Sequence, residues 1–284
     1  KIPQTENTRE TFPRQHPRQR TDSSVDLPAP YEITINMLIR LIFLSFLLMG
    51  KAYADNQTRY SLGVGAFANT GDYDSEADAP ATRMQFLPVT FKLQQGNWTA
   101  RLQTAWVKIS GPGNLGEGIR VATDRHAATG LGDTVLGLDW RHLGGRWLVE
   151  PGMRIKLPSA DEDKGLGTGS RDYSAQLAAM ALLQTWRPFA QLGYKWRGHS
   201  DLIELRNGAF GNLGLDHAFS NRFSTGVGYD WRRASTAQQP PGRELFLYAS
   251  WQSAKSWKQM LYFAKGFSDT SADKTIGIQI SHNW

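Results

Sequence analysis

Apolar and polar residues alternate with a period of two along most of the chain after residue 54, which is the spacing of a β-strand whose two faces meet different surroundings. Residues 146–158 give the clearest example, because Trp147, Val149 and Ile155 share one face while Glu150 and Arg154 share the other. No window of about 11 to 18 residues in this part has the 3.6-residue apolar period of an amphipathic helix. The pattern therefore predicts an all-β fold.

About twelve strands are expected from this alternation. We place them near residues 58–68, 83–94, 97–110, 131–143, 146–158, 171–182, 185–197, 207–219, 222–233, 243–253, 256–267 and 274–284. Short turns alternate with longer loops, and the short turns fall at Gln95-Gly96, Gly144-Gly145, Leu183-Gln184, Ser220-Asn221 and Ala254-Lys255. An even strand number with short turns at one rim and long loops at the other predicts a transmembrane antiparallel β-barrel in the cell outer membrane, with both termini in the periplasm.

A soluble β-sandwich or a lipocalin-like barrel would also alternate with a period of two. The distribution of residue types favours the membrane barrel, because the polar face carries Gly, Ser, Gln and charges of both signs while the apolar face carries aromatic residues at its ends. The chain has 28 Gly and 10 Trp. Seven tryptophans are predicted to lie at the membrane interface: Trp98, Trp106, Trp147, Trp186, Trp196, Trp231 and Trp284.

Residues 37–54 have the pattern of a secretory signal peptide. They begin at Met37, carry a short apolar run, and end in small residues at Ala52 and Ala54, which predicts cleavage before Asp55. The apolar run is about half of the ~20 residues that a membrane-spanning helix needs, so a signal peptide is favoured over a membrane anchor.

Residues 1–36 precede this signal, are rich in Pro, Gln, Arg and Thr, and have no periodic apolar pattern. We expect them to be a disordered upstream extension that results from a misassigned start, with Met37 as the true start. A disordered cytoplasmic tail is the alternative. Residues 55–284 are then the outer-membrane β-barrel.

The final predicted strand alternates apolar residues up to an aromatic residue, with Ile276, Ile278, Ile280 and then Trp284. This ending resembles the assembly signal of outer-membrane proteins. It implies that the barrel-assembly machinery is a partner through the C-terminal strand, and that outer-membrane lipid and lipopolysaccharide surround the protein.

Composition removes several other classes. The chain has no Cys, so a disulfide framework, a thiolate metal site and a lipoprotein anchor are all unavailable. The formal net charge is +6, but Lys and Arg are spread singly along the strands, and no nucleic-acid partner is expected.

Three local patterns could carry chemistry. Residues 165–170, Gly-Leu-Gly-Thr-Gly-Ser, lack the Lys and the following helix of a phosphate loop, so we interpret them as a surface-loop hinge. Asp161, Glu162 and Asp163 could bind Ca²⁺, but their spacing matches no calcium loop, and we expect no metal and no cofactor. No His has a Ser two positions later, so an outer-membrane lipid hydrolase is the less favoured alternative to a channel and no catalytic residue is assigned.

The polar strand faces predict the lining of the lumen and the path of a solute: Arg101, Glu150, Arg154, Lys156, Arg187, Lys195, Asp230, Phe246, Tyr248 and Tyr262. We expect most charges to pair across strands, leaving a mild preference for anions. Pairing residues whose numbers sum to about 510 sets Tyr248 opposite Tyr262, as an aromatic patch. A one-residue change of register would turn this patch toward lipid instead.

The loops and strand ends carry a more specific resemblance. The pieces are Gly130-Leu131-Gly132-Asp133, Lys156-Leu157-Pro158-Ser159-Ala160-Asp161, and Gly165-Leu166-Gly167-Thr168-Gly169-Ser170. They resemble the outer-membrane transporter family labelled for the MetA pathway of phenol degradation. The resemblance implies a porin-like channel for passive uptake of small, aromatic or hydrophobic solutes. A lipid-modifying hydrolase and a purely structural barrel are the alternatives.

Overall fold

The computed structural model describes residues 58–71, 81–111, 127–201 and 203–284, and these residues form one closed β-barrel. Within these ranges, no helix is long and apolar enough to cross a bilayer. The predicted upstream extension (1–36) and signal peptide (37–54) lie outside the described residues.

The barrel wall contains fourteen strand segments. In chain order they are β1 (Thr58–Gly71), β2 (Thr82–Gln95), β3 (Trp98–Ser110), β4 (Ala127–Leu131), β5 (Thr134–Trp140), β6 (His142–Gly144), β7 (Trp147–Leu157), β8 (Asp172–Ala181), β9 (Trp186–Trp196), β10 (Gly208–Ala218), β11 (Phe223–Arg232), β12 (Gly242–Gln252), β13 (Trp257–Gly266) and β14 (Lys274–Asn283).

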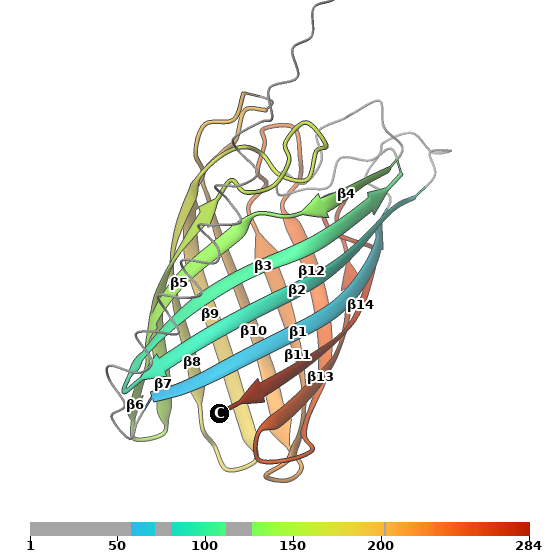
Figure 1. The fold of residues 1–284 in the computed structure, drawn as a ribbon. Coiled ribbons are helices and arrows are strands. Elements are labelled where there is room, and N and C mark those ends of the chain that lie inside the picture. The colour runs from blue at the N-terminus through green and yellow to red at the C-terminus, as the bar shows by residue number, and fades with distance from the viewer. Residues whose placement is uncertain (1–57, 72–80, 112–126, 202) are drawn as a thin grey trace, which may run out of the picture. The chain divides into compact units, whose positions relative to one another are not determined.

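All neighbouring strands are antiparallel, and β1 pairs with β14 to close the barrel (Figure 1). Since β4 and β5 both pair with β3, and β5 and β6 both pair with β7, these three segments share one wall position. Fourteen segments therefore make twelve positions, which confirms the predicted fold class.

The fourth predicted strand, 131–143, is wrong in one respect, because it starts earlier and is interrupted twice. The first interruption falls at Gly132 and Asp133. There the Gly132 N–H donates to the Ala105 carbonyl (2.8 Å), and the Asp133 side chain turns toward Lys156 (3.0 Å). The Asp133–Lys156 ion pair thus takes the place of regular strand pairing at this point.

The connections alternate as predicted between short turns and long loops. Gly96 and Gly145 open two of the turns with φ angles of 55° and 60°, a region where glycine has no steric penalty. We call the two ends of the barrel the short-turn rim and the long-loop rim. The start of β1 and the end of β14 both lie at the short-turn rim, where Figure 1 marks the C-terminus.

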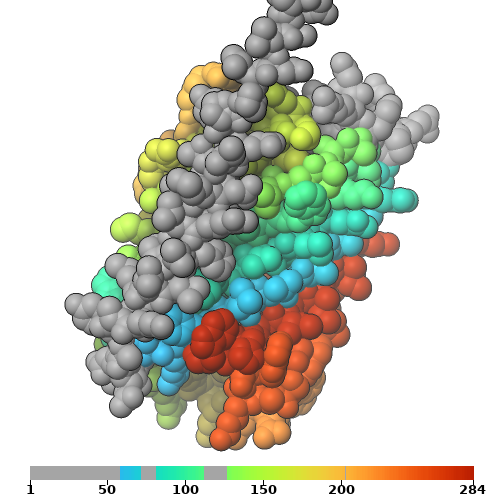
Figure 2. Space-filling view, viewed as in Figure 1, coloured from blue at the N-terminus to red at the C-terminus, as the bar shows by residue number. Residues whose placement is uncertain are grey.

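The outer surface is an apolar belt. Large side chains such as Leu192 (73% exposed), Met153 (64%) and Ile276 (64%) point away from the barrel, an arrangement that suits hydrocarbon. Figure 2 shows part of this surface, where β1, β14 and β13 lie side by side. An outward apolar face on a closed barrel is the arrangement of an outer-membrane protein.

Six of the seven predicted interface tryptophans are about half exposed on this outer face, and Trp231 is partly buried. They fall into two groups along the strands. Trp98, Trp147, Trp186 and Trp284 lie near the short-turn rim, whereas Trp106, Trp196 and Trp231 lie on the long-loop side. Their positions fit two aromatic girdles, and their contact with lipid headgroups remains a prediction.

We expect the protein to be recovered from the outer-membrane fraction and to migrate faster on a denaturing gel before boiling than after it. Because β1 pairs with β14, most of the wall has no open edge at which detergent could separate the strands at room temperature. N-terminal sequencing of the same material should begin at Asp55. Release of the protein into the soluble fraction without detergent would contradict this expectation.

Candidate channel lumen

The inner face of the barrel carries all ten residues that the sequence predicts for the solute path. Their inward orientation follows from their position between outward neighbours, as with Phe246 between the exposed Leu245 and Leu247. The predicted pairing of Tyr248 with Tyr262 is confirmed. The structure gathers these ten residues into several clusters at different heights.

At the long-loop rim, the loop between β7 and β8 folds into the barrel. Leu166 is 2% exposed and Ser170 is 1% exposed. Leu166 packs with the inward side chains of Val107 and Ile109 in the main buried apolar cluster. The interpretation of residues 165–170 as a surface hinge is therefore wrong, because these residues fill the mouth of the barrel.

A polar network centred on Lys156 holds this loop in place. The Lys156 Nζ donates to Thr168 Oγ1 (2.8 Å) and forms ion pairs with Asp133 Oδ2 (3.0 Å) and Asp172 Oδ2 (3.2 Å). Ser170 Oγ donates to the other Asp172 oxygen (2.9 Å). We call these five residues the mouth network. It ties strand β7, the break before β5, the loop and the start of β8 to one ammonium group.

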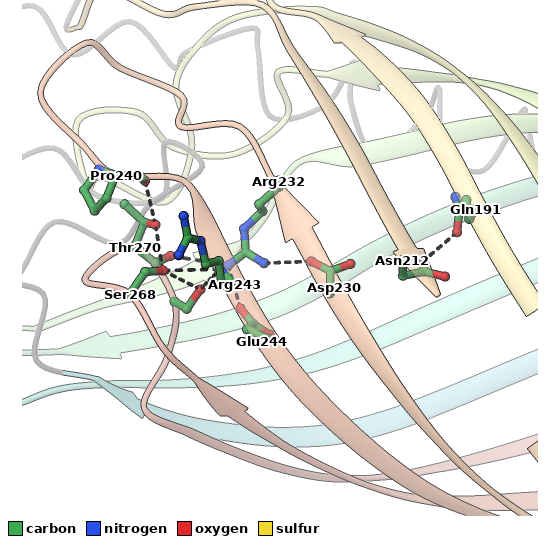
Figure 3. A network of polar contacts seen from close by, with 10 residues as sticks. Gln191, Asn212, Asp230, Arg232, Pro240, Arg243, Glu244, Ser268 and Thr270 are labelled. Carbon is green, nitrogen blue, oxygen red and sulfur yellow. Dashed lines mark hydrogen bonds and ion pairs between the residues drawn. The ribbon is translucent and has the colours of Figure 1, made fainter. Parts of the chain in front are cut away.

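A second loop, residues 267–273, also folds inward beside β12 (Figure 3). Arg232 pairs with Glu244 (2.6 Å) and Asp230 (3.2 Å) and donates to the Thr270 carbonyl (3.3 Å). Thr270 Oγ1 in turn donates to the Pro240 carbonyl (3.0 Å). Two loops therefore narrow the lumen from the long-loop rim.

Below the loops, five aromatic rings form a continuous series along the inner wall, and we call them the aromatic arc. The centroid of Phe67 lies 4.9 Å from Phe86 and 6.1 Å from Tyr262. Tyr262 lies 6.0 Å from Phe246, which lies 6.4 Å from Phe189. The series runs from β2 to β9 and crosses eight of the twelve wall positions.

Glycines on the intervening strands make room for the arc. Three of the five rings each lie over a glycine paired directly with them on the neighbouring strand, and a methyl group there would overlap the ring. The pairs are Phe67–Gly277, Phe246–Gly228 and Phe189–Gly214. The rings therefore lie along the wall, which leaves space at the centre of the lumen.

Tyr248 joins the arc to a polar cluster. Its hydroxyl donates to Asp216 Oδ2 (2.8 Å), and Arg187 forms an ion pair with the same carboxylate. The sequence alone identifies Tyr248 and Tyr262 but misses Phe67, Phe86 and Phe189. Each of these three could have been found as an aromatic residue at an inward strand position. In two of the three cases a glycine occupies the paired position on the next strand.

On the opposite wall, Asp139 accepts from two arginines. It is 3% exposed and pairs with Arg154 (2.7 Å) and Arg101 (3.2 Å). Arg141 pairs with Glu150 (3.3 Å) closer to the short-turn rim. The expected cross-strand pairing of lumen charges is therefore present, since each of these carboxylates contacts an arginine on an adjacent strand.

Two cavities open within the barrel. One of about 420 Å³ lies beneath the folded loop, between apolar side chains that include Phe86 and Leu166 and cations that include Lys156 and Lys195. The other, of about 590 Å³, lies at the short-turn rim and is rich in Lys and Arg. The acidic residues 161–163 belong to neither, and Asp161 pairs with Lys164 (2.7 Å).

Residues 89–283 match the model of the family described as "Putative MetA-pathway of phenol degradation". The chain belongs to this family. The sequence pieces that carry the resemblance meet in the mouth network, since Asp133, Lys156 and Thr168 each come from a different piece. No curated protein matches the chain.

Solved structures of outer-membrane channels are similar in fold. An outer-membrane channel from Pseudomonas putida F1 is 12% identical, with a TM-score of 0.62 over 81% of this chain and 97% of that one. The NanC porin is 12% identical, with a TM-score of 0.51 over 78% of this chain and 98% of that one. The KdgM porin is 10% identical, with a TM-score of 0.50 over the same shares.

Proposed function

We propose that the protein is an outer-membrane channel through which small aromatic solutes enter the cell by passive diffusion. The observation that carries this proposal is the aromatic arc, since its rings occupy inward positions on strands whose inner faces also carry polar residues and glycine. The family is labelled for phenol degradation, and the similar structures are described as a channel and as porins. Both facts support transport of such solutes.

The arc suits transient binding. A ring pair contributes about 0.5–1.5 kcal/mol beyond burial, so a solute ring stacking on one or two arc residues is held weakly and can leave again. Since the arc spans successive strands, a solute can exchange one partner for the next. This exchange between rings needs no energy source, so the proposed movement of the solute follows its concentration gradient.

A lipid hydrolase on the outer face has little support. His217 points outward and packs between the rings of Trp186 (4.2 Å) and Phe219 (4.5 Å). Its Nδ1 has no hydrogen-bond partner among the described residues, so no serine is positioned to give up a proton to this nitrogen. We infer that the protein is not an enzyme.

The orientation and assembly of the barrel are part of the proposal. With the long loops outside the cell, the start of β1 and the end of β14 both lie on the periplasmic side. The C-terminal strand is then the segment that the assembly machinery binds before β1 and β14 pair. In the closed barrel Trp284 is bonded to Tyr60 through backbone N–H and carbonyl groups (3.0 Å each way), so closure would displace a bound partner.

The test is the double variant Tyr248→Ala with Tyr262→Ala. Loss of two adjacent rings should slow uptake of a radiolabelled phenol by about tenfold in Gram-negative cells that make the protein, because two stacking contacts of about 0.5–1.5 kcal/mol disappear. Gel mobility before and after boiling verifies that the barrel has assembled.

Tyr173→Ala is the matched control, because Tyr173 is 48% exposed on the outer face. It removes one ring of the same kind from the lipid side and should leave uptake unchanged. Unchanged uptake in the assembled double variant would remove Tyr248 and Tyr262 from the mechanism.

A further inference from the structure

The short-turn rim contains a strongly positive cavity that the proposed uptake of aromatic solutes does not explain. Six cationic side chains line this 590 Å³ space, which we call the vestibule: Arg59, Lys92, Arg101, Arg141, Lys255 and Lys258. The one acidic side chain among the lining residues is Glu150.

The vestibule keeps a net positive charge although two of its six cations, Arg101 and Arg141, are paired with carboxylates. Glu150 contacts Arg141, and nearby Asp139 is shared by two arginines. Lys92 and Lys258 make no ion pair with any carboxylate in the part of the chain that the structure describes. Arg101, Arg141 and Lys258 lie close enough to Lys92 to repel its charge, and Asp139 offsets part of this repulsion.

Higher in the lumen, three cations are each held by one or two carboxylates. Arg187 pairs with Asp216, Lys156 with two aspartates, and Arg232 with two acidic residues. The positive potential of the lumen is therefore concentrated at one end. A low-dielectric wall around a cluster of like charges focuses this field and raises the local concentration of the opposite ion.

The cluster lies next to the aromatic arc. Lys258 and Tyr262 are on the same inner face of β13, four residues and therefore about 13 Å apart along the strand. Met260 lies between them, also facing inward. An extended Lys258 side chain shortens this gap. A solute with a ring and an anionic group can therefore leave the arc while its anionic group contacts the cations of the vestibule.

We propose that the solutes of this channel are aromatic monocarboxylates, and that the vestibule is the site that attracts their carboxylate. The inference rests on the proposed channel function and names its substrate class. The ring contacts the arc and the carboxylate contacts the ammonium groups of Lys92 and Lys258, both of which are accessible from the lumen. The unpaired ammonium groups attract the carboxylate of the solute. Because these groups are hydrated, they bind the carboxylate only weakly.

The experiment is the measurement of reversal potentials for the whole protein in planar bilayers, with potassium salts of chloride, benzoate and gluconate. Anions should be favoured over K⁺ by about three- to tenfold at 0.1 M salt, and benzoate should pass several times more readily than gluconate, which has a carboxylate but no ring. Anion preference should fall toward unity at 1 M salt, since the screening length drops from about 10 Å to about 3 Å.

The variant Lys92→Gln with Lys258→Gln should remove most of the anion preference while leaving single-channel conductance within about a factor of two. The control Lys108→Gln removes a cation outside the vestibule and should change neither quantity. A second variant, Arg59→Gln with Lys255→Gln, should lower anion preference without altering any strand pairing in the middle of the wall.

The two proposals fail in distinguishable ways. Conductance with no anion preference, with equal passage of benzoate and gluconate, or with a preference untouched by both double variants overturns the carboxylate assignment and leaves the channel intact. Absence of conductance together with absence of phenol uptake overturns the channel itself, and the carboxylate assignment with it.

Discussion

Replacing Lys156 with Met should release the folded loop and widen the mouth of the channel. The substitution removes the ammonium group that joins Asp133 and Asp172, and it leaves two carboxylates facing each other. These side chains are only 10–19% exposed, so water compensates poorly. Loss of one partner from such a pair costs about 3–5 kcal/mol, and we expect the lower end of this range.

This cost falls mainly on the loop, because every strand pairing of β7 remains available. Residues 165–170 should leave the lumen, and single-channel conductance should roughly double or more as the constriction opens. Lys164→Met is the matched control on the same loop, since the Lys164–Asp161 pair is 40–45% exposed and contributes little. An unchanged conductance in an assembled Lys156→Met barrel would mean that the loop does not limit flow.

Replacing Gly277 with Ala should disrupt the aromatic arc at Phe67. The new methyl group would overlap the Phe67 ring close to its attachment point, so the ring has to rotate away from the wall. Overpacking of this kind costs about 1–3 kcal/mol. The displaced ring loses its contacts with Phe86 and Tyr262 and projects into the lumen, so aromatic flux should fall by about tenfold.

Two further variants isolate this effect. Gly63→Ala places a methyl group on the same inner surface, 3.2 Å from the flexible amide end of Gln279, and should cost no more than about 0.5 kcal/mol. In a Phe67→Ala background, Gly277→Ala should cost no further stability, because the overlap disappears with the ring. Denaturant unfolding in detergent measures the stability of these variants. Equal stability of Gly277→Ala and the natural protein would show that the Phe67 ring is not packed tightly against Gly277.

The wall of the barrel could be predicted well because its signal is local. Each strand reveals its two faces through alternation, and the short turn at Ala254-Lys255 sets the register that pairs Tyr248 with Tyr262. The charge partners of Asp139 also follow from adjacent strands. Every such inference needs only neighbouring segments.

The contents of the lumen could not be predicted in the same way. Leu166 lies in a glycine-rich loop that has no period, and its burial depends on Val107 and Ile109, more than fifty residues away. Phe67 meets Tyr262 only after β1 pairs with β14, and Phe189 meets Phe246 across two intervening strands. Long-range packing of this kind leaves no mark in local alternation, although glycine paired opposite an inward ring is a signal that can be searched for.

The central claim, that this barrel is a narrow passive channel, is tested most directly by recording the purified protein in planar bilayers. The folded loops and the arc predict discrete conductance steps much smaller than those of a porin of about sixteen strands, and current proportional to voltage. Complete absence of steps from protein whose gel mobility is heat-modifiable would contradict the account, as would a wide, porin-like conductance.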